Sequence, residues 1–85
     1  MPEKEKIVYI VTHGGEDPER ATFPFMFATA AQTMEVETVV TLQGAGVYLA
    51  KRGYLDHVGA AGLPPLKDLV QTFISEGGQL LVCIP

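Results

Sequence analysis

Residues 7–21 read I-V-Y-I-V-T-H-G-G-E-D-P-E-R-A, and this stretch decides the fold. It begins with a continuous run of apolar and β-branched residues, 7–12, which is typical of a strand buried on both faces of a parallel sheet. Two glycines break the run, and signals for a helix start follow. Asp17 suits the N-cap, Pro18 suits the first helical position, and Glu19 suits the positive end of the helix dipole. The stretch therefore predicts a strand, a tight turn and a helix.

The predicted helix continues to about Met34. Its apolar residues recur at helical spacing, so we expect them to form the face that packs on the core: Phe23, Phe27, Ala30, Ala31 and Met34. Pro24 lies inside this span and allows two interpretations. The helix kinks at Pro24, or a short first turn precedes a main helix that begins there.

Two more strands are predicted farther along the chain. Residues 36–42 are rich in β-branched residues, and residues 79–84 form another apolar run that a proline ends. Between these strands we expect a short helix over about 47–52, a long loop over 54–65 and an amphipathic helix over 66–74.

Strands that alternate with helices predict an α/β domain with a short parallel sheet and right-handed crossovers. For three strands we expect the order 2-1-3, which places the first strand in the middle and helices on both faces. The direction of winding then reverses at the first strand, so a crevice opens beyond the carboxyl ends of the first and third strands. Five residues are expected to border this crevice: His13, Gly14, Gly15, Glu16 and Cys83.

Length and charge exclude several classes of protein. Residues 1–6 predict a frayed leader, and residues 7–85 suffice for a single domain. The net charge is −4 and the six Lys and Arg residues are scattered, so neither nucleic-acid binding nor adhesion to anionic membranes is expected. No apolar run approaches the roughly 20 residues of a membrane span, and the charged start does not predict a secretory signal.

The chain is apolar for its size, with 47% hydrophobic and 19% charged residues. A tightly packed core explains part of this excess, and an apolar surface that a second copy covers explains the rest. We therefore expect a homo-oligomer. A single cysteine cannot form an intrachain disulfide, which favours a cytoplasmic location.

Cys83 is the first candidate for chemistry, and two interpretations are open. Free cysteines are often buried, so Cys83 could be a small hydrophobe packed in a strand. Alternatively, it lies near the carboxyl end of an inner strand, where its thiolate can reach the crevice. A reactive thiolate needs hydrogen-bond donors or positive charge around it, and His13 and the amide groups at the start of the first helix are the candidates.

The loop that follows the first strand is the second candidate. It is either a plain turn or an anion pocket, in which His13 carries a proton and backbone amides bind the anion. The residues expected in such a pocket are Gly14, Gly15 and Glu16, together with Gln43 and Gly44 after the second strand.

Other chemistries have little support in the sequence. Gly44-Ala45-Gly46 lacks the third glycine of a dinucleotide motif, so close backbone packing explains it better. No metal site and no cofactor are expected, because the two histidines lie far apart and one cysteine makes a poor ligand set. The single serine, Ser75, is on a predicted helix without a nucleophile-elbow pattern.

The whole pattern resembles the DsrE/DsrF/DsrH-like family of small sulfur-relay proteins. The similar segments are I-V-T-H-G-G-E-D-P-E-R-A, A-T-A-A-Q-T-M, V-V-T-L-Q-G with V-Y-L-A-K-R-G, and L-K-D-L-V-Q-T-F-I-S-E-G-G-Q-L-L-V-C-I-P. The resemblance implies a flavodoxin-like three-layer sandwich, homo-oligomers such as trimers or hexamers, and a cysteine that carries persulfide sulfur, here Cys83. Relatives continue past this cysteine with another helix and strand. Two expectations are therefore open: the sequence is truncated at its carboxyl end, or a neighbouring copy covers the exposed edge of the sheet.

Two functions follow as hypotheses. The first is a persulfide carrier or sulfurtransferase, in which Cys83 takes sulfur from a protein donor and passes it to a protein acceptor. The second is a non-catalytic oligomeric module that binds a small anion or a nucleotide at its glycine-rich loops.

Overall fold

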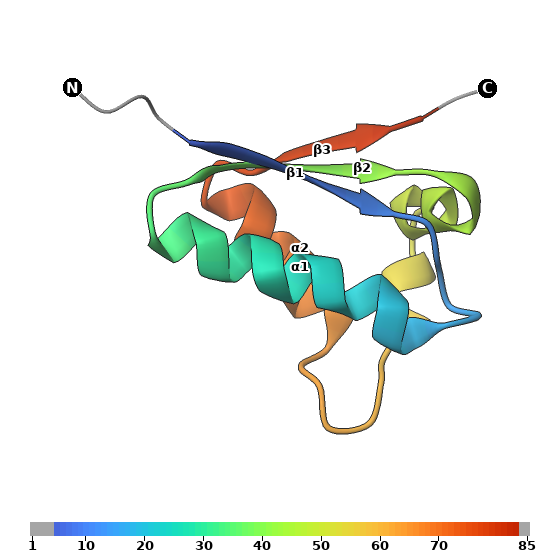
Figure 1. Cartoon of the computed structure of the whole chain (residues 1–85). Helices are drawn as coiled ribbons and strands as arrows, with labels where there is room; N and C mark the ends of the chain where they lie inside the picture. The colour runs from blue at the N-terminus through green and yellow to red at the C-terminus, as the bar shows by residue number, and fades with distance from the viewer. Residues whose placement is uncertain (1–4, 84–85) are drawn as a thin grey trace.

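The computed structural model describes residues 5–83, which form one sheet and a layer of helices (Figure 1). In chain order the elements are β1 (Lys6–Val11), α1 (Pro18–Thr33), β2 (Glu37–Leu42), the 3-10 helices η1 (Gly44–Ala50) and η2 (Tyr54–His57), α2 (Leu66–Ser75) and β3 (Gln79–Val82). The predicted strands and both long helices are confirmed. The loop expected over 54–65 contains a 3-10 helix at its start, which the sequence pattern did not indicate.

Two predictions concern the ends of the chain. The leader expected over residues 1–6 lies mainly outside the described residues, and its last residue, Lys6, already belongs to β1. The third strand ends at Val82, and the remainder of its predicted span after residue 83 also lies outside the described part.

All three strands are parallel, and their order in the sheet is β1-β2-β3. The α/β class is confirmed, and the arrangement is compatible with a flavodoxin-like fold. The expected strand order 2-1-3 is wrong. Figure 1 shows α1 and α2 on the same face of the sheet, so the described residues form two layers. Because right-handed crossovers on one face advance in one direction, β3 is added beyond β2, and no reversal of winding occurs at β1.

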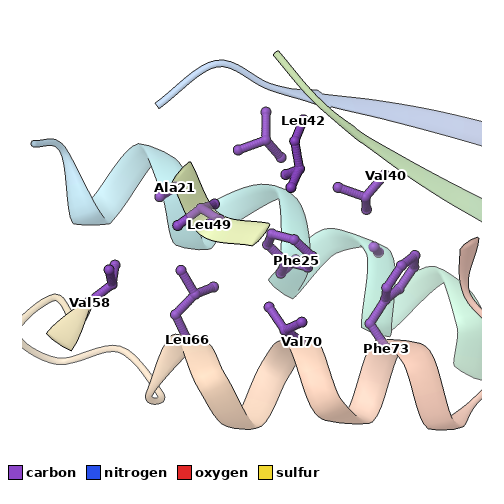
Figure 2. Close-up of a cluster of buried hydrophobic side chains, with 11 residues drawn as sticks. Ala21, Phe25, Val40, Leu42, Leu49, Val58, Leu66, Val70 and Phe73 are labelled. Carbon is purple, nitrogen blue, oxygen red and sulfur yellow. The ribbon is translucent and has the colours of Figure 1, made fainter. Parts of the chain in front are cut away.

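The core lies between the sheet and the two long helices (Figure 2). Phe25 of α1 and Phe73 of α2 are almost fully buried, and their rings meet edge to face with centroids 5.9 Å apart. Val40 and Leu42 of β2 point toward them from the sheet. Full burial of a side chain of this size contributes about 1.5–3 kcal/mol, so these contacts are a large part of the stability of a small domain.

The core face of α1 differs from the predicted one. Its buried apolar residues are Ala21, Phe25, Ala28 and Ala31, of which only Ala31 was expected. Phe27 and Met34 are 57% and 75% exposed. The helix carries apolar residues on two sides. The side with alanines packs inward, because small residues let α1 approach its neighbours while Phe25 fills the space beside Phe73.

The start of α1 follows the capping signals. Asp17 is the N-cap, and its carboxylate accepts a hydrogen bond from the amide of Arg20 at 3.2 Å. Pro24 lies inside a helix that is continuous from residue 18 to residue 33, so the interpretation with a separate first turn is wrong. The loop before the cap is therefore followed directly by a long helix.

The other face of the sheet carries no helix in the part of the chain that the structure describes (Figure 1). Ile10, Thr41 and Leu81 are paired across the three strands, one row away from the residues that face the core. Val8, Ile10 and Leu81 are 53%, 56% and 43% exposed. Within residues 5–83, helices cover only one face of β1, so the expectation that the first strand is buried on both faces is wrong.

Candidate functional site

The carboxyl ends of the three strands meet at one edge of the sheet, and every predicted site residue follows one of them. The loop with His13 follows β1, Gln43 and Gly44 follow β2, and Cys83 follows β3. Two backbone hydrogen bonds continue the ladders past the strand ends. The Cys83 amide donates to the carbonyl of Leu42, and the Gln43 amide donates to the carbonyl of Val11, each at 2.9 Å.

Cys83 is exposed, so it is not a core residue. It stands two positions after Leu81, and side chains of a strand alternate between the two faces. The thiol therefore belongs to the face of the sheet that is opposite to the helices. An exposed thiol at the carboxyl edge of a parallel sheet is open to a partner molecule.

The loop between β1 and α1 is organised around the carboxylate of Glu16. One of its oxygens, Oε2, lies 2.9 Å from Nδ1 of His13, and the other, Oε1, accepts a hydrogen bond from the Gly14 amide. These hydrogen bonds, first that from His13 and then that from Gly14, lower the pKa of Glu16 below its ordinary value. The carboxylate is therefore ionised at neutral pH, and His13 has an acidic partner within its own loop.

The same loop packs on the two 3-10 helices. The Gly15 amide donates a hydrogen bond to the Tyr54 hydroxyl at 2.7 Å, and the Tyr54 ring stacks on Tyr48 with centroids 6.1 Å apart. A Cβ atom on Gly14 would lie 2.8 Å from the carbonyl oxygen of Ala45. The absence of a side chain at this glycine therefore lets η1 and the loop approach each other closely.

Gly46 of η1 shows the same close packing against the end of β1. It is buried, and a Cβ atom there would fall far inside van der Waals contact with the carbonyl group of Val11. Backbone packing against the end of β1 therefore explains Gly46. Gly44 is favoured for a different reason, its positive φ of 53°.

The structure groups some of the predicted site residues and separates others. His13, Gly14 and Glu16 form one hydrogen-bonded cluster, and the neighbouring Gly15 bonds to Tyr54. Cys83 does not join this cluster, because β2 lies between β1 and β3. Two strand spacings separate the ends of β1 and β3 by about 10 Å. We expected a crevice between adjacent first and third strands. This expectation is wrong, because β2 lies between them at the carboxyl edge of the sheet.

The amides expected to bind an anion already have acceptors within the chain. The Gly14 amide is taken by Glu16 and the Gly15 amide by Tyr54. An external anion would have to displace the carboxylate of Glu16, which carries the same charge. Sequence reasoning missed Tyr54 because its hydroxyl meets a loop 39 positions earlier, and no local pattern carries that contact.

Residues 5–83 lack the features of two kinds of protein, those that bind a metal ion and those that cross a membrane by a helix. They contain no group of three or more His, Cys, Asp or Glu side chains that could hold a metal ion. None of the helices in this part of the chain combines the length and the apolar character needed to cross a bilayer.

Fold and site together define a small α/β domain with a parallel sheet, an exposed thiol at the carboxyl edge and a histidine–carboxylate loop beside it. Comparison with known families agrees with this class. The model of the DsrE/DsrF-like family matches residues 5–85, and the chain belongs to this family. A curated relative is the uncharacterized protein MJ0760 of Methanocaldococcus jannaschii, which is 33% identical over 79 residues. The match covers 93% of this chain and 29% of the relative, so the chain spans less than a third of that protein's length.

Proposed function

We propose that this protein is a sulfur-relay protein, a persulfide carrier or sulfurtransferase, in which Cys83 receives and passes on sulfane sulfur. The observation that carries the proposal is the exposure of Cys83 at the carboxyl edge of the sheet. Membership of the DsrE/DsrF-like family supports it. A thiol packed in the core could not meet a donor, whereas this one needs no opening of the fold.

The proposed step is an exchange between sulfur atoms. The thiolate of Cys83 attacks the outer sulfur of a donor persulfide, R–S–SH. A new S–S bond forms at Cys83, the S–S bond of the donor breaks, and the donor leaves as the thiolate R–S⁻. Attack by an acceptor thiolate on the outer sulfur of Cys83–S–SH then regenerates the Cys83 thiolate. Neither step consumes an oxidant or a reductant.

In this proposal His13 serves as a proton carrier for the partner rather than for Cys83 directly. β2 lies between the strands that precede the two residues, and the His13 ring pairs with Glu16 instead of the thiol. A donor or acceptor protein that lies across the edge of the sheet can contact both places. We therefore propose protein partners for both steps, with His13 giving a proton to, or taking one from, their sulfur atoms.

Assembly and location belong to the same proposal. Val8, Ile10 and Leu81 form an exposed apolar row on the face without helices, which supports a homo-oligomer such as a trimer or a hexamer. A reducing cytoplasm would keep the thiol of Cys83 available between transfers.

The test is direct loading of the protein with sulfur. The native chain is incubated with a low-molecular-weight persulfide, freed of excess donor and weighed by intact mass spectrometry. We expect a gain of one sulfur atom, which a thiol reductant removes and which Cys83→Ser abolishes. A protein that gains no sulfur, or a gain that survives Cys83→Ser, contradicts the proposal. Because the chain has a single cysteine, no second thiol can complicate the result.

A further inference from the structure

Glu16 occupies an unusual position for an exposed acidic residue, because both oxygens of its carboxylate are engaged within its own loop. Oε2 meets Nδ1 of His13 and Oε1 meets the amide of Gly14. The two contacts fix the orientation of the carboxylate as well as its position. The His13 side chain is about one-third exposed, so the ring borders solvent while its Nδ1 edge faces the carboxylate.

The chemistry of the two partners determines which ring nitrogen carries the hydrogen. An ionised carboxylate has no hydrogen to donate, so Nδ1 of His13 must be the donor in this contact. In the neutral ring the other nitrogen, Nε2, then has a free lone pair. The lowered pKa of Glu16 keeps the carboxylate ionised at neutral pH, so it remains the acceptor in this contact. Carboxylates that bind one ring nitrogen set the tautomer of catalytic and metal-binding histidines in the same manner.

We propose that Glu16 is a positioning residue for the sulfur exchange, which holds His13 in the tautomer whose Nε2 accepts a proton from a partner's thiol. The inference rests on the proposed function for its chemistry and on the loop geometry for its structural part. A partner thiol loses its proton to Nε2 and becomes the attacking thiolate, and the resulting imidazolium stays paired with Glu16. The proton later returns to a leaving thiolate.

Other charged and polar groups near the loop do not take the place of Glu16 as the partner of the His13 ring. The carboxylate of Asp17 caps α1 and pairs with Arg20, at 3.2 Å to its amide and 3.6 Å to its side chain. The Tyr54 hydroxyl accepts a hydrogen bond from Gly15. Glu19 is exposed in the first turn of α1. Within residues 5–83 the hydrogen bond recorded for the His13 ring is the one to Glu16.

The structural part of the proposal is tested by nitrogen-15 NMR of the histidine rings in the full chain. We expect His13 to show the tautomer with hydrogen on Nδ1, and His57, an exposed histidine in η2, serves as the internal reference. Glu16→Ala should move His13 to the Nε2–H form that free histidine prefers. Glu16→Gln keeps an oxygen acceptor and should retain more of the Nδ1–H form. Glu19→Gln is the matched control and should change nothing.

The functional part is tested by the rate of sulfur transfer from persulfidated Cys83 to a small acceptor protein that carries one exposed thiol. Glu16→Ala should slow transfer about 10-fold or more, as loss of a residue that orients a reactive group commonly does. The double variant His13→Ala with Glu16→Ala should be no slower than His13→Ala alone, because Glu16 acts only through the ring. The Nε2–H form in the unmodified protein, or unchanged transfer in Glu16→Ala, overturns the proposal. Failure of Cys83 to take up sulfur overturns the proposed function instead, and the NMR result distinguishes the two outcomes.

Discussion

The reactivity of Cys83 in the native protein is the sharpest prediction, because a buried and an exposed thiol would react at rates that differ by orders of magnitude. A thiol that is reached only through global unfolding reacts more slowly by the unfolding equilibrium constant. At about 0.05–0.15 kcal/mol per residue, a chain of 85 residues is stable by about 4–13 kcal/mol. Since about 1.4 kcal/mol corresponds to a factor of ten, a buried thiol would be protected at least about 700-fold.

The structure predicts almost no protection, because the side chain of Cys83 is already exposed. The native chain should react with a chromogenic disulfide within about a factor of ten of the unprotected rate, since local structure at a strand end opens readily. The reference is a synthetic peptide of residues 79–85, measured at the same pH and without denaturant. Both reactions should end at one thiol per molecule, and Cys83→Ser should give none.

The refuting result is equally definite. Suppose that the native chain reacts more than about 100-fold more slowly than the peptide, and that urea restores its full rate. This result would show that Cys83 is covered in the folded protein. The covering could come from a second copy of the chain on the open face of the sheet. Measurement at several protein concentrations separates this case, because protection by an oligomer is lost on dilution and protection by the fold is not.

Three further predictions concern stability and the loop. Phe73→Ala should lower the free energy of unfolding by about 3–5 kcal/mol in urea titration, because a fully buried ring is lost, and a loss below about 1 kcal/mol would contradict the described core. Gly46→Ala should cost about 1–3 kcal/mol through its clash with the last carbonyl of β1, whereas Gly59→Ala, with open space around it, should stay within about 0.5 kcal/mol. His13→Ala should raise the pKa of Glu16 toward its ordinary value in carbon-13 NMR titration, because its main hydrogen bond is lost. The pKa of Glu16 is lower in the folded protein than in the unfolded one. The stabilisation from this hydrogen bond is therefore fully present above the unfolded pKa and is lost as the pH falls through the folded pKa. An unchanged acid-unfolding profile in His13→Ala would contradict this prediction.

Local signals predicted the elements of this chain well. Asp17 and Pro18 mark the start of α1 correctly, and Gly77 has the positive φ of 91° that lets the chain leave α2. Apolar runs located the strands because β-branched residues at this density have few alternatives. The candidate site was also partly predictable, since residues that follow parallel strands must gather at one edge of the sheet.

Long-range packing could not be predicted in the same way. Phe25 and Phe27 are equally apolar, and only contact with Phe73 decides that Phe25 faces the core. The strand order depends on which face of the sheet α2 covers, and its sequence pattern is compatible with either face. The contact of Tyr54 with Gly15 has no local signature for the same reason.

The position of β2 in the middle of the sheet determines how the site can work. Its backbone is hydrogen-bonded to Val11 on one side and to Cys83 on the other, so the distance between the thiol and the His13 loop is set by two ladders rather than by flexible side chains. The thiol also belongs to the face of the sheet opposite to the helices, while the loop packs on η1 and η2. Within residues 5–83 the imidazole of His13 is held by Glu16 in its own loop and not by the thiol. Joint use of both groups therefore requires a partner that lies across the end of β2 and contacts Gln43 and Gly44. Substitution at Gln43 should then weaken sulfur transfer to such a partner. The reaction of Cys83 with a small reagent should stay unchanged.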